Sequence, residues 1–418
     1  MATSSYSEKI QNKESNLKVI CILCSCIVPL LVTGPFLPDL IVSSLSIWFI
    51  YYSINRKIFW IYKNIYFYFF IFFCFVIILS SLLSEDIIFS LKSSLFYFRI
   101  GVFALLISYL ISQNKKILDY FYYSLLITFT AIVLDGYYQY FNGYNIIGMP
   151  IKDFRVSSFF GDELVMGSYL SRLFPLLFAL FVVKKSKSKF EIFGISLLFV
   201  FVDVLIFISG ERTAFALLNL STVFIIIFIS KYKLLRLCVF VISISIISLF
   251  TLNDNNLYGR YVESPLQSMG ITSIDEKKYF FTQAHDSMIR TSWNMFLDKP
   301  ILGHGPKFFR IKCSDPKFAE GIKPCDNHPH NFYLQLLAET GSVGFSFLAG
   351  LFIYFAYVMV RHLKQYLFNQ RVLLNDYQIC LYAGLLITIW PLTTNGNIFT
   401  NYLMLFYSLQ MGFFRKKI

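Results

Sequence analysis

The stretch YFYFFIFFCFVIILSSLL, from Tyr66 to Leu83, contains no charged residue and is nearly long enough to cross a lipid bilayer as a helix. Such a helix needs about 20 predominantly apolar residues. Similar stretches recur along the chain, which is 56% hydrophobic and only 15% charged, whereas soluble globular proteins contain about 25% charged residues. A membrane β-barrel would instead show short segments of alternating polarity. The sequence therefore predicts an all-α, polytopic integral membrane protein.

Apolar runs of sufficient length predict about twelve transmembrane helices. Their expected limits are 17–34, 37–54, 64–83, 95–112, 117–140, 164–183, 190–209, 213–230, 234–252, 331–360, 374–393 and 397–413. The run from Val19 is not followed by a small-residue cleavage site, so we interpret it as the first helix and not as a signal peptide. Residues 1–252 then hold helices 1–9, residues 253–329 form a large loop with short helices, and residues 330–418 hold helices 10–12.

The net charge of +13 arises from lysines and arginines that cluster in short connections between apolar runs. The basic connections are NRK, QNKK, KKSKSK, SKYKLLR, RHLKQYLFNQR and RKK, and they alternate with TGPFLPD, SEDIIFS and TTNGN, which contain no Lys or Arg. Basic loops remain in the cytoplasm. We therefore predict a bacterial inner-membrane protein with both termini in the cytoplasm and the 253–329 loop in the periplasm. This distribution argues against a nucleic-acid partner.

Ionisable and polar residues gather at the predicted outer ends of the helices, where they are costly and indicate function. They are Arg99, Asp135, Gln139, Asp162, Glu163, Arg172, Glu211, Arg212 and, in the large loop, Arg290. The structural alternative is snorkelling and ion pairing, for example between Asp286 and Arg290, one helical turn apart. Arginine is suited to binding phosphate through permanently charged, bidentate contacts. Several arginines on one face therefore favour a phosphate-binding site.

The segment HPHNFYLQLLAETGSVG, from His328 to Gly344, joins the large loop to the tenth predicted helix. Helical spacing places one polar stripe along this helix, made of Asn331, Gln335, Glu339, Ser342 and Ser346. The stripe must face protein or a wet cavity because lipid offers no hydrogen-bond partner. Small residues at Ala338, Gly341 and Gly344 would permit close helix packing.

A histidine at the mouth of such a cavity can transfer protons near neutral pH. This property favours a catalytic role for His330 over interhelical hydrogen bonding alone. We expect His328 to point elsewhere because Pro329 keeps the segment extended.

The large loop should contain a helix that ends at Pro300. Apolar residues recur at helical spacing in DEKKYFFTQAHDSMIRTSWNMFLDKP, namely Phe281, Met288, Trp293, Phe296 and Leu297. The loop also contains Cys313 and Cys325, for which the periplasm would permit a disulfide. Two free thiols are the alternative. A zinc site with the nearby histidines is a third interpretation, although the spacing matches no common zinc pattern.

An ordered set of motifs resembles the O-antigen ligase and O-antigen polymerase superfamily. HNFYLQLLAETGSVG, in which Gly341 follows Asn331 by ten residues, looks like its signature. SGERTAFALLNL, with Arg212, looks like its periplasmic arginine motif, although Ala216 stands where many ligases have leucine. IRTSWNMFLDKPILGHGPKFF, with Arg290, resembles its loop element. FRVSSFFGDELVMGSYLSR and WPLTTNGNIFTNYL also resemble segments of some members. The resemblance covers about residues 135–410.

This resemblance implies a metal-independent glycosyltransferase that needs no cofactor and uses an undecaprenyl-diphosphate-linked glycan as donor. His330 would be the catalytic base, and Arg212 and Arg290 would bind the diphosphate. Supporting roles are expected for Asn331, Glu211, Arg99, Glu163, Arg172 and Glu339.

The acceptor would be lipid A-core for a ligase of lipopolysaccharide biosynthesis. It would be another glycan repeat for a polymerase, or a protein for some relatives. A polysaccharide transporter or flippase is the alternative from another class. The absence of an internal repeat and the large one-sided loop favour an enzyme.

Overall fold

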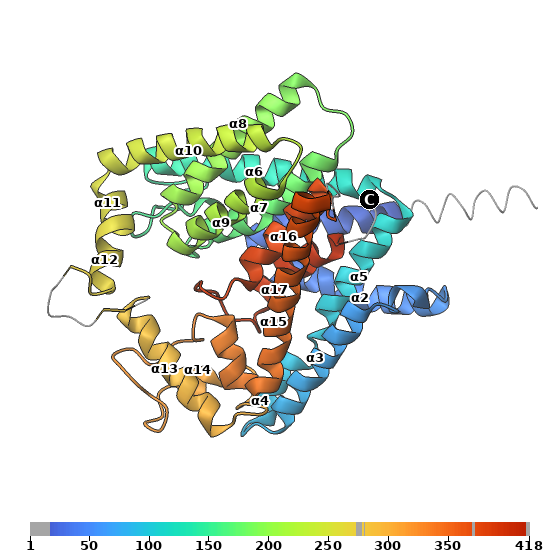
Figure 1. The fold of residues 1–418 in the computed structure, drawn as a ribbon, viewed down its shortest axis with the longest axis vertical. Helices are drawn as coiled ribbons and strands as arrows, with labels where there is room; N and C mark the ends of the chain where they lie inside the picture. Colours follow the sequence, from blue (N-terminus) through green and yellow to red (C-terminus); the bar gives the residue numbers. More distant parts are fainter. Residues whose placement is uncertain (1–16, 273–277, 280, 370–372, 415–418) are drawn as a thin grey trace, which may run out of the picture.

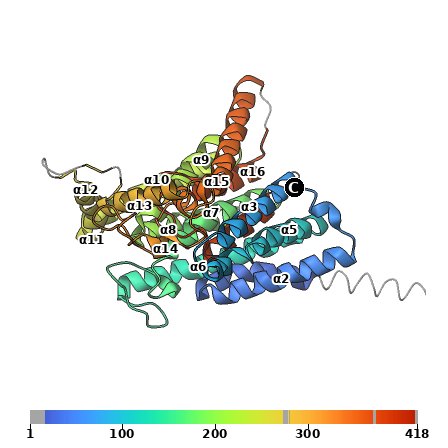
Figure 2. The same ribbon diagram turned by 90° about the horizontal axis from the view of Figure 1, so that it is seen from below.

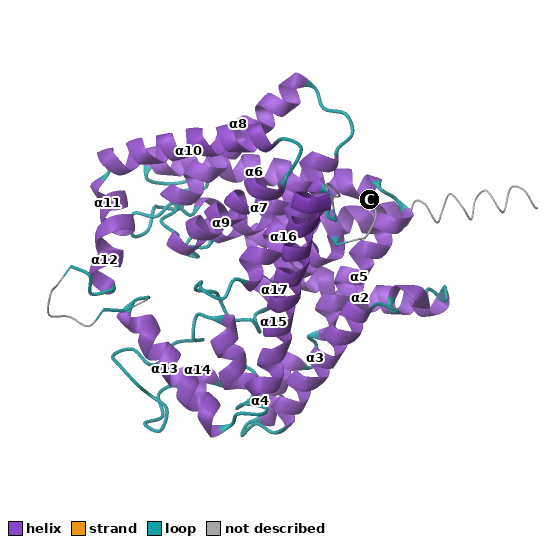
Figure 3. Cartoon of the chain, in the orientation of Figure 1, coloured by secondary structure: helices purple, strands orange, loops and turns teal. Residues whose placement is uncertain are grey.

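The computed structural model describes residues 17–272, 278–279, 281–369 and 373–414 (Figure 1). Within these residues the chain folds entirely into helices and loops, and it forms no strand beyond two isolated β-bridges (Figure 3). The protein is an all-helical polytopic membrane protein, which confirms the predicted fold class.

Every predicted span overlaps a helix of the structure. The first is the apolar helix Leu17–Thr33. The other long helices are α2 (Phe36–Asn55), α3 (Ile65–Leu82), α5 (Phe98–Gln113), α6 (Lys116–Asn142), α7 (Met166–Val183), α8 (Lys189–Ile208), α9 (Arg212–Phe228), α10 (Lys233–Asn253), α15 (Phe332–Lys364), α16 (Asp376–Ile389) and α17 (Asn401–Phe413). Eight helices of the described chain are long and apolar enough to cross a membrane. The total of twelve spans stays a prediction.

The connections add shorter helices. These are α4 (Ile87–Ser94), α11 (Asn255–Tyr258), α12 (Ser264–Ser268), α13 (Gln283–Asp298) and α14 (Phe309–Lys312). Helix α15 passes through the middle of the molecule beside α16 and α17, with α6–α10 on one side and α2, α3 and α5 on the other (Figure 1). Viewed from below, α2 lies at the edge of the bundle, beside α5 (Figure 2).

Helix α9, which begins with Arg212, is held in the bundle by an ion pair between its neighbours. The Arg236 guanidinium on α10 donates to the Asp203 carboxylate on α8 at 2.8 Å, and both side chains are buried. Arg236 also donates to Thr222 of α9. Because an intramembrane charge is tolerated only when paired, this contact fixes the packing of the three helices.

Several connections on the side that is predicted to be periplasmic contact one another. The Lys312 ammonium pairs with Glu85 at 2.6 Å, and the Ser90 hydroxyl donates to the Pro306 carbonyl oxygen at 3.3 Å. On the same side the Tyr402 hydroxyl donates to the Leu31 carbonyl oxygen at 3.2 Å. These contacts join the ends of helices that are far apart in the sequence.

Helix α15 is broken at Gly341, where φ is +64°. The segment from Pro300 to Gly305 lies in the break. Its backbone accepts from the amides of Ser342 and Val343 and donates to the carbonyls of Ala338 and Glu339. A Cβ at Gly341 would lie 2.3 Å from the Ile301 carbonyl carbon, so only glycine fits. Gly303 and Gly341 are both required by this close approach of the two backbones.

The break corrects the predicted polar stripe. Asn331, Gln335 and Glu339 face protein, but Ser342 and Ser346 are exposed. The expectation of one continuous stripe was wrong because the non-helical residue Gly341 changes the direction of every side chain after it.

Helix α13 confirms the predicted loop helix, although its buried face differs from the expected one. Met288 is 2% exposed, but Trp293 and Leu297 are 48% and 59% exposed, and Phe281 precedes the helix. Met288 and Met295 share a small core with Ala338 of α15, and the other buried residues of the helix are small and polar, namely Ser287, Thr291 and Ser292. Apolar spacing alone therefore identified the helix but not its orientation.

Candidate active site

His330 is held by its backbone at the N-terminus of α15. Its φ of +55° is unusual for a residue other than glycine, and its carbonyl oxygen accepts a hydrogen bond from the Asn395 amide at 2.7 Å. The next residue, Asn331, caps α15 by accepting from the amides of Tyr333 and Leu334, and its side-chain amide donates to the Pro391 carbonyl oxygen at 2.8 Å. His330 is therefore fixed between α15 and the loop of residues 391–400.

Two other imidazoles and one carboxylate lie around His330. The His330 Nε2 lies 3.4 Å from Asp326 Oδ2, and the His330 side chain is 30% exposed. The ring centroids of His328 and His285 lie 4.2 Å and 5.7 Å from that of His330. A carboxylate beside an imidazole orients the ring and favours its service as a base.

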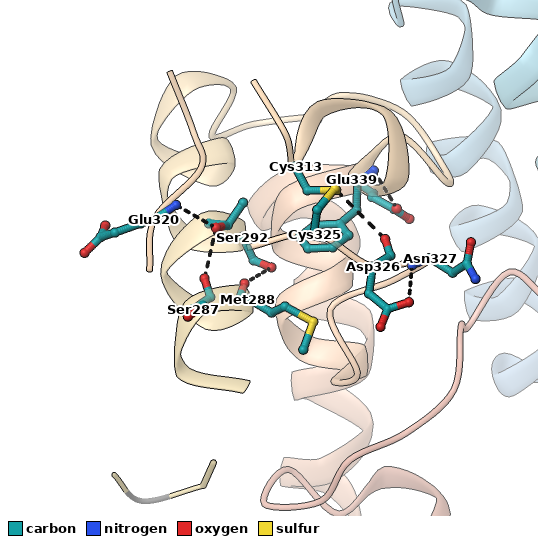
Figure 4. Close-up of a disulfide and its surroundings, with 11 residues drawn as sticks. Ser287, Met288, Ser292, Cys313, Glu320, Cys325, Asp326, Asn327 and Glu339 are labelled. Atoms are coloured by element: carbon teal, nitrogen blue, oxygen red, sulfur yellow. Dashed lines mark hydrogen bonds between the residues drawn. A yellow bond between two sulfur atoms is a disulfide. The ribbon is translucent and has the colours of Figure 1, made fainter. Parts of the chain in front are cut away.

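The carboxylate partner is placed by the paired cysteines. In the structure Cys313 and Cys325 are joined by a disulfide with a Cα–Cα distance of 4.9 Å, and Asp326 follows directly (Figure 4). Cys313 is fully buried in a small core with Met288 and other residues of the loop. Burial raises the pKa of Asp326, but hydrogen bonds from the Asn327 amide and from His330 outweigh it and lower the pKa overall. Asp326 is thus kept as the anion that orients His330.

We expect mass spectrometry of the purified protein without reductant to find the Cys313–Cys325 linked peptide. The double variant Cys313→Ala/Cys325→Ala should lose about 2–4 kcal/mol of stability, as is typical for a native disulfide. It should also lose transfer activity because Asp326 would no longer be held beside His330. Two freely alkylated thiols in the wild-type protein would contradict the prediction.

His328 does not point away from His330, so that expectation was wrong. The His328 Nε2 lies 3.1 Å from the Asn395 carbonyl oxygen, and this contact turns the ring inward towards its neighbour. Burial, followed by the nearby His330, lowers the pKa of His328 to about 4. His328 is therefore a neutral donor to the 391–400 loop, and its role is to hold that loop.

The lowered pKa of His328 predicts that acid destabilises the protein. An unfolded histidine titrates near pH 6.5, so between about pH 6.5 and 4 the unfolded state binds a proton that the folded state does not. Stability should fall with decreasing pH across this window by up to about 1.4 kcal/mol per pH unit for this one group. Thermal melting in detergent measures the slope, which His328→Gln should reduce. An unchanged slope in that variant would exclude the assignment.

Arg212 belongs to a cluster of three arginines, Arg155, Arg212 and Arg260. The Arg260 Nε donates to the Gly210 carbonyl oxygen at 2.5 Å, and the Arg155 Nε donates to the Ser209 carbonyl oxygen at 3.1 Å. Backbone carbonyls next to Arg212 thus hold both neighbouring guanidinium groups. The Arg212 guanidinium, at the first residue of α9, makes no hydrogen bond to the side chain or backbone of another described residue.

The cluster carries more positive charge than its surroundings neutralise. Burial, and then repulsion by Arg260, lowers the pKa of Arg155. The nearby carboxylate, Glu211, is already committed, because it accepts from the amides of Gly167 and Ser168 and from the Ser168 hydroxyl. Like charges held together in this way favour binding of a polyanion.

His285 links the arginine cluster to the histidines. Its Nδ1 lies 2.7 Å from the Thr282 hydroxyl at the start of α13. Burial, followed by the nearby charges of His330 and Arg212, lowers the pKa of His285. The His285 ring, 5.7 Å from that of His330, is therefore also close enough to Arg212 to be affected by its charge.

Arg290 is not brought to Arg212 or His330 by any hydrogen bond or ion pair among the described residues. Its guanidinium pairs with Asp286 at 2.8 Å, which confirms that predicted ion pair, and with Glu320 at 2.9 Å. The Arg290 side chain is 41% exposed. It lies on α13, two turns or less from His285, with both of its bonding edges occupied by carboxylates.

The residues predicted to support the site have separate positions. Glu339 is fully buried and accepts from the amides of Lys307 and Phe309 and from Gln335, so it clamps the loop element beside α15. Glu211 caps the start of α7. Glu163 is exposed in the connection before α7.

No hydrogen bond or ion pair among the described residues joins Arg172 or Arg99 to the arginine cluster. Arg172 is 4% exposed inside α7, and two of its nitrogen atoms have no partner among the described residues. Arg99 pairs with Asp39 at 2.8 Å.

Four residues of this site were not identified from the sequence: Arg155, Arg260, His285 and Asp326. Arg155 lies in the quoted segment FRVSSFFGDELVMGSYLSR. An arginine in this segment could have been recognised as a candidate phosphate ligand. Arg260, His285 and Asp326 have no distinctive spacing, although His285 stands in the segment that predicts the loop helix, and only the fold brings them together. Among the described residues no group of three or more His, Cys, Asp or Glu side chains is arranged to hold a metal ion.

A comparison with known families matches residues 194–349 to the O-antigen ligase family. The match runs from α8 to the middle of α15 and includes Arg212, Arg260, His285, Arg290 and His330. A comparison with curated proteins found no match. The family match over residues 194–349 agrees with the resemblance of the ordered motifs to the O-antigen ligase and polymerase superfamily.

Proposed function

We propose that the protein transfers a glycan from undecaprenyl diphosphate to an acceptor at the periplasmic face of the inner membrane. The observation that carries this proposal is a cluster of three arginines of which one, Arg212, is close enough to affect the pKa of His285, whose ring lies 5.7 Å from that of His330. The arginines offer a site for a diphosphate, and the histidine with its carboxylate offers a base. A glycosyl diphosphate transfer needs both functions in one place.

In the proposed reaction the acceptor hydroxyl gives its proton to His330 as its oxygen attacks the anomeric carbon of the donor. The bond between that carbon and the diphosphate oxygen breaks, and the electron pair leaves with the diphosphate. Charge therefore develops on the leaving group. The guanidinium groups are already oriented by the backbone carbonyls of Ser209 and Gly210, and preorganised donors of this kind stabilise such charge most. We propose that no metal ion is needed.

We propose that Arg290 also binds the diphosphate, after exchanging one of its two carboxylate partners for the ligand. Asp286 and Glu320 are partly exposed, so the exchange does not leave a buried charge unpaired. Exposed ion pairs are weak because water screens them, so the ligand can replace one of the two carboxylates. In this arrangement Arg290 would bind the diphosphate from the outer side of the site and Arg212 from the inner side.

The acceptor that we propose first is lipid A-core, as in O-antigen ligation during lipopolysaccharide biosynthesis. Polymerisation, in which the acceptor is another lipid-linked repeat unit, is the alternative within the same superfamily. Both reactions use the same donor and the same base.

The function is tested with the purified protein in nanodiscs, an undecaprenyl-diphosphate glycan and one acceptor at a time. Transfer to lipid A-core supports ligation, and chain extension of the donor supports polymerisation. If the donor binds but undecaprenyl diphosphate is released in neither reaction, the proposed activity is rejected. The same assay with an added chelator tests the metal independence.

The topology provides a prediction that does not depend on activity. A cysteine replacing Leu297, which is 59% exposed on α13, should react with a membrane-impermeant reagent in intact spheroplasts. A cysteine replacing Gln113, exposed at the end of α5 beside a basic connection, should react only after lysis. The reverse pattern would place the active site in the cytoplasm.

A further inference from the structure

A second polar site lies in a cavity of about 400 Å³ between α2, the α4–α5 region and α17. Its volume is within the range of small-molecule sites, about 300–1,000 Å³. The cavity shares no residue with the arginine cluster or the histidines. It lies at the same end of the bundle, because Asp39 and Asn401 in its wall begin α2 and α17 next to the connections described above.

The polar wall of the cavity is a fixed network with little net charge. The Asp39 carboxylate accepts from the Arg99 guanidinium at 2.8 Å and from the Asn401 side-chain amide at 2.9 Å. The side chains of Asp39 and Arg99 remain 24% and 14% exposed. The wall thus offers oriented donors and acceptors. Asp39 would repel a phosphate placed on this wall, whereas a neutral polyhydroxyl group can satisfy both kinds of partner.

The remaining walls are aromatic and open towards lipid. Phe96 and Phe98 line the cavity, and Phe96 is 58% exposed. Ile47, on the α2 side, is 67% exposed, and α2 is apolar enough to cross a membrane. A ligand with an apolar tail could therefore enter from the bilayer with its polar head among these rings. A lysine, Lys92, stands exposed at the rim.

A hydrogen-bonded loop connects this cavity to His330. Within residues 391–401, the Asn395 amide donates to the His330 carbonyl oxygen, and the Ile398 carbonyl oxygen accepts from Tyr97, which lines the cavity, at 3.3 Å. Between them, Asn397 accepts from Gln335 of α15 at 2.8 Å. The loop ends at Asn401, which binds Asp39. One short segment thus touches both the base and the second cavity.

We propose that this cavity binds the saccharide headgroup of a membrane glycolipid. The assignment of this glycolipid as the glycosyl acceptor rests on the proposed function. The arginine cluster would then hold the donor. The 391–400 loop would lie between the two lipids and keep the acceptor sugar beside His330.

The binding test uses photo-cross-linking of the full-length protein and needs no turnover. Phe96→p-benzoylphenylalanine places the probe in the cavity. The matched control is Phe141→p-benzoylphenylalanine, at the exposed end of α6, where the ring is 74% exposed. The vesicles contain phosphatidylethanolamine, phosphatidylglycerol and a minority of monoglucosyl diacylglycerol. We expect the glycolipid to be enriched about tenfold among the adducts at position 96, equivalent to about 1.4 kcal/mol of preference, and not at position 141.

A filled cavity provides the second arm of the experiment. Ser43→Trp, at a half-buried position that lines the cavity, should abolish the enrichment. Ser44→Trp, at the next and exposed position, should not. Equal glycolipid labelling at positions 96 and 141, preferential phospholipid adducts at position 96, or enrichment that survives Ser43→Trp would each overturn the proposal.

The acceptor assignment is tested separately by kinetics. Ser43→Trp should raise the KM for the acceptor lipid about tenfold and leave the KM for the donor unchanged, whereas Ser44→Trp should change neither. Glycolipid labelling together with an unchanged acceptor KM would overturn the acceptor role alone. Labelling in a protein that transfers no glycan would separate this site from the proposed function.

Discussion

Replacing His330 with alanine is expected to lower the rate of glycan transfer by about 10²–10⁴-fold, the usual contribution of a general base. The reason is that the variant leaves the acceptor hydroxyl without a proton acceptor at the position that Asp326 orients. Donor binding should survive, because the arginines that would bind the diphosphate are unchanged in this variant. The measurements are single-turnover transfer in nanodiscs and, separately, binding of the undecaprenyl-diphosphate donor.

His328→Ala is the matched control for this result. Its ring lies 4.2 Å from that of His330 but donates to the backbone of the 391–400 loop. We expect this variant to lose stability and to keep most of its turnover. Full turnover in His330→Ala, or loss of donor binding together with turnover, would show that His330 is not a base acting on the acceptor.

Arg212→Lys is expected to lower turnover by about 10²–10³-fold, the loss typical of removing one donor to a charge that develops in the transition state. Lysine keeps the positive charge but lacks the planar fork that binds two phosphate oxygens at once. A large loss in this variant would therefore report geometry and not charge. Donor binding should also weaken, in contrast to the result expected for His330→Ala.

Arg290→Lys provides the comparison for Arg212. Arg290 begins with two carboxylate partners and is 41% exposed, so its net contribution to the bound diphosphate should be smaller and the loss of turnover closer to tenfold. Equal losses in both variants would indicate that Arg290 reaches the diphosphate as directly as Arg212. Near-normal transfer by Arg212→Lys would contradict a direct phosphate role.

The sequence was sufficient to locate the helices, because a bilayer imposes one requirement on every span. Each span must satisfy its backbone hydrogen bonds within its own helix, and it needs about 20 mostly apolar residues to cross the bilayer. The face of a helix was harder to predict. The prediction that Ser342 and Ser346 continue the polar stripe was wrong because the regular spacing of α15 stops at Gly341. The expected face of Trp293 and Leu297 was wrong because much of the buried face of α13 is made of small polar residues.

The candidate site was predictable where a residue stands in a distinctive motif. His330 and Arg212 were identified in this way. Arg260 and Asp326 were not, because their importance depends on contacts with the Gly210 carbonyl oxygen and with His330. A long separation in the sequence hides such contacts until the fold is known.

The segment that lies in the break of α15 also has a consequence for biogenesis. When the translocon releases α15, the amides and carbonyls around Gly341 have no partners within their own helix, and each unsatisfied group in lipid costs several kcal/mol. Their partners lie in residues 300–305, which are synthesised just before α15. The Ser80 hydroxyl of α3, which donates to the carbonyl oxygens of Leu302 and Glu339, has by then long been in the bilayer. Stable integration of α15 is therefore expected to be coupled to docking of its own upstream loop against an early helix, before α16 and α17 add the 391–400 loop to the site.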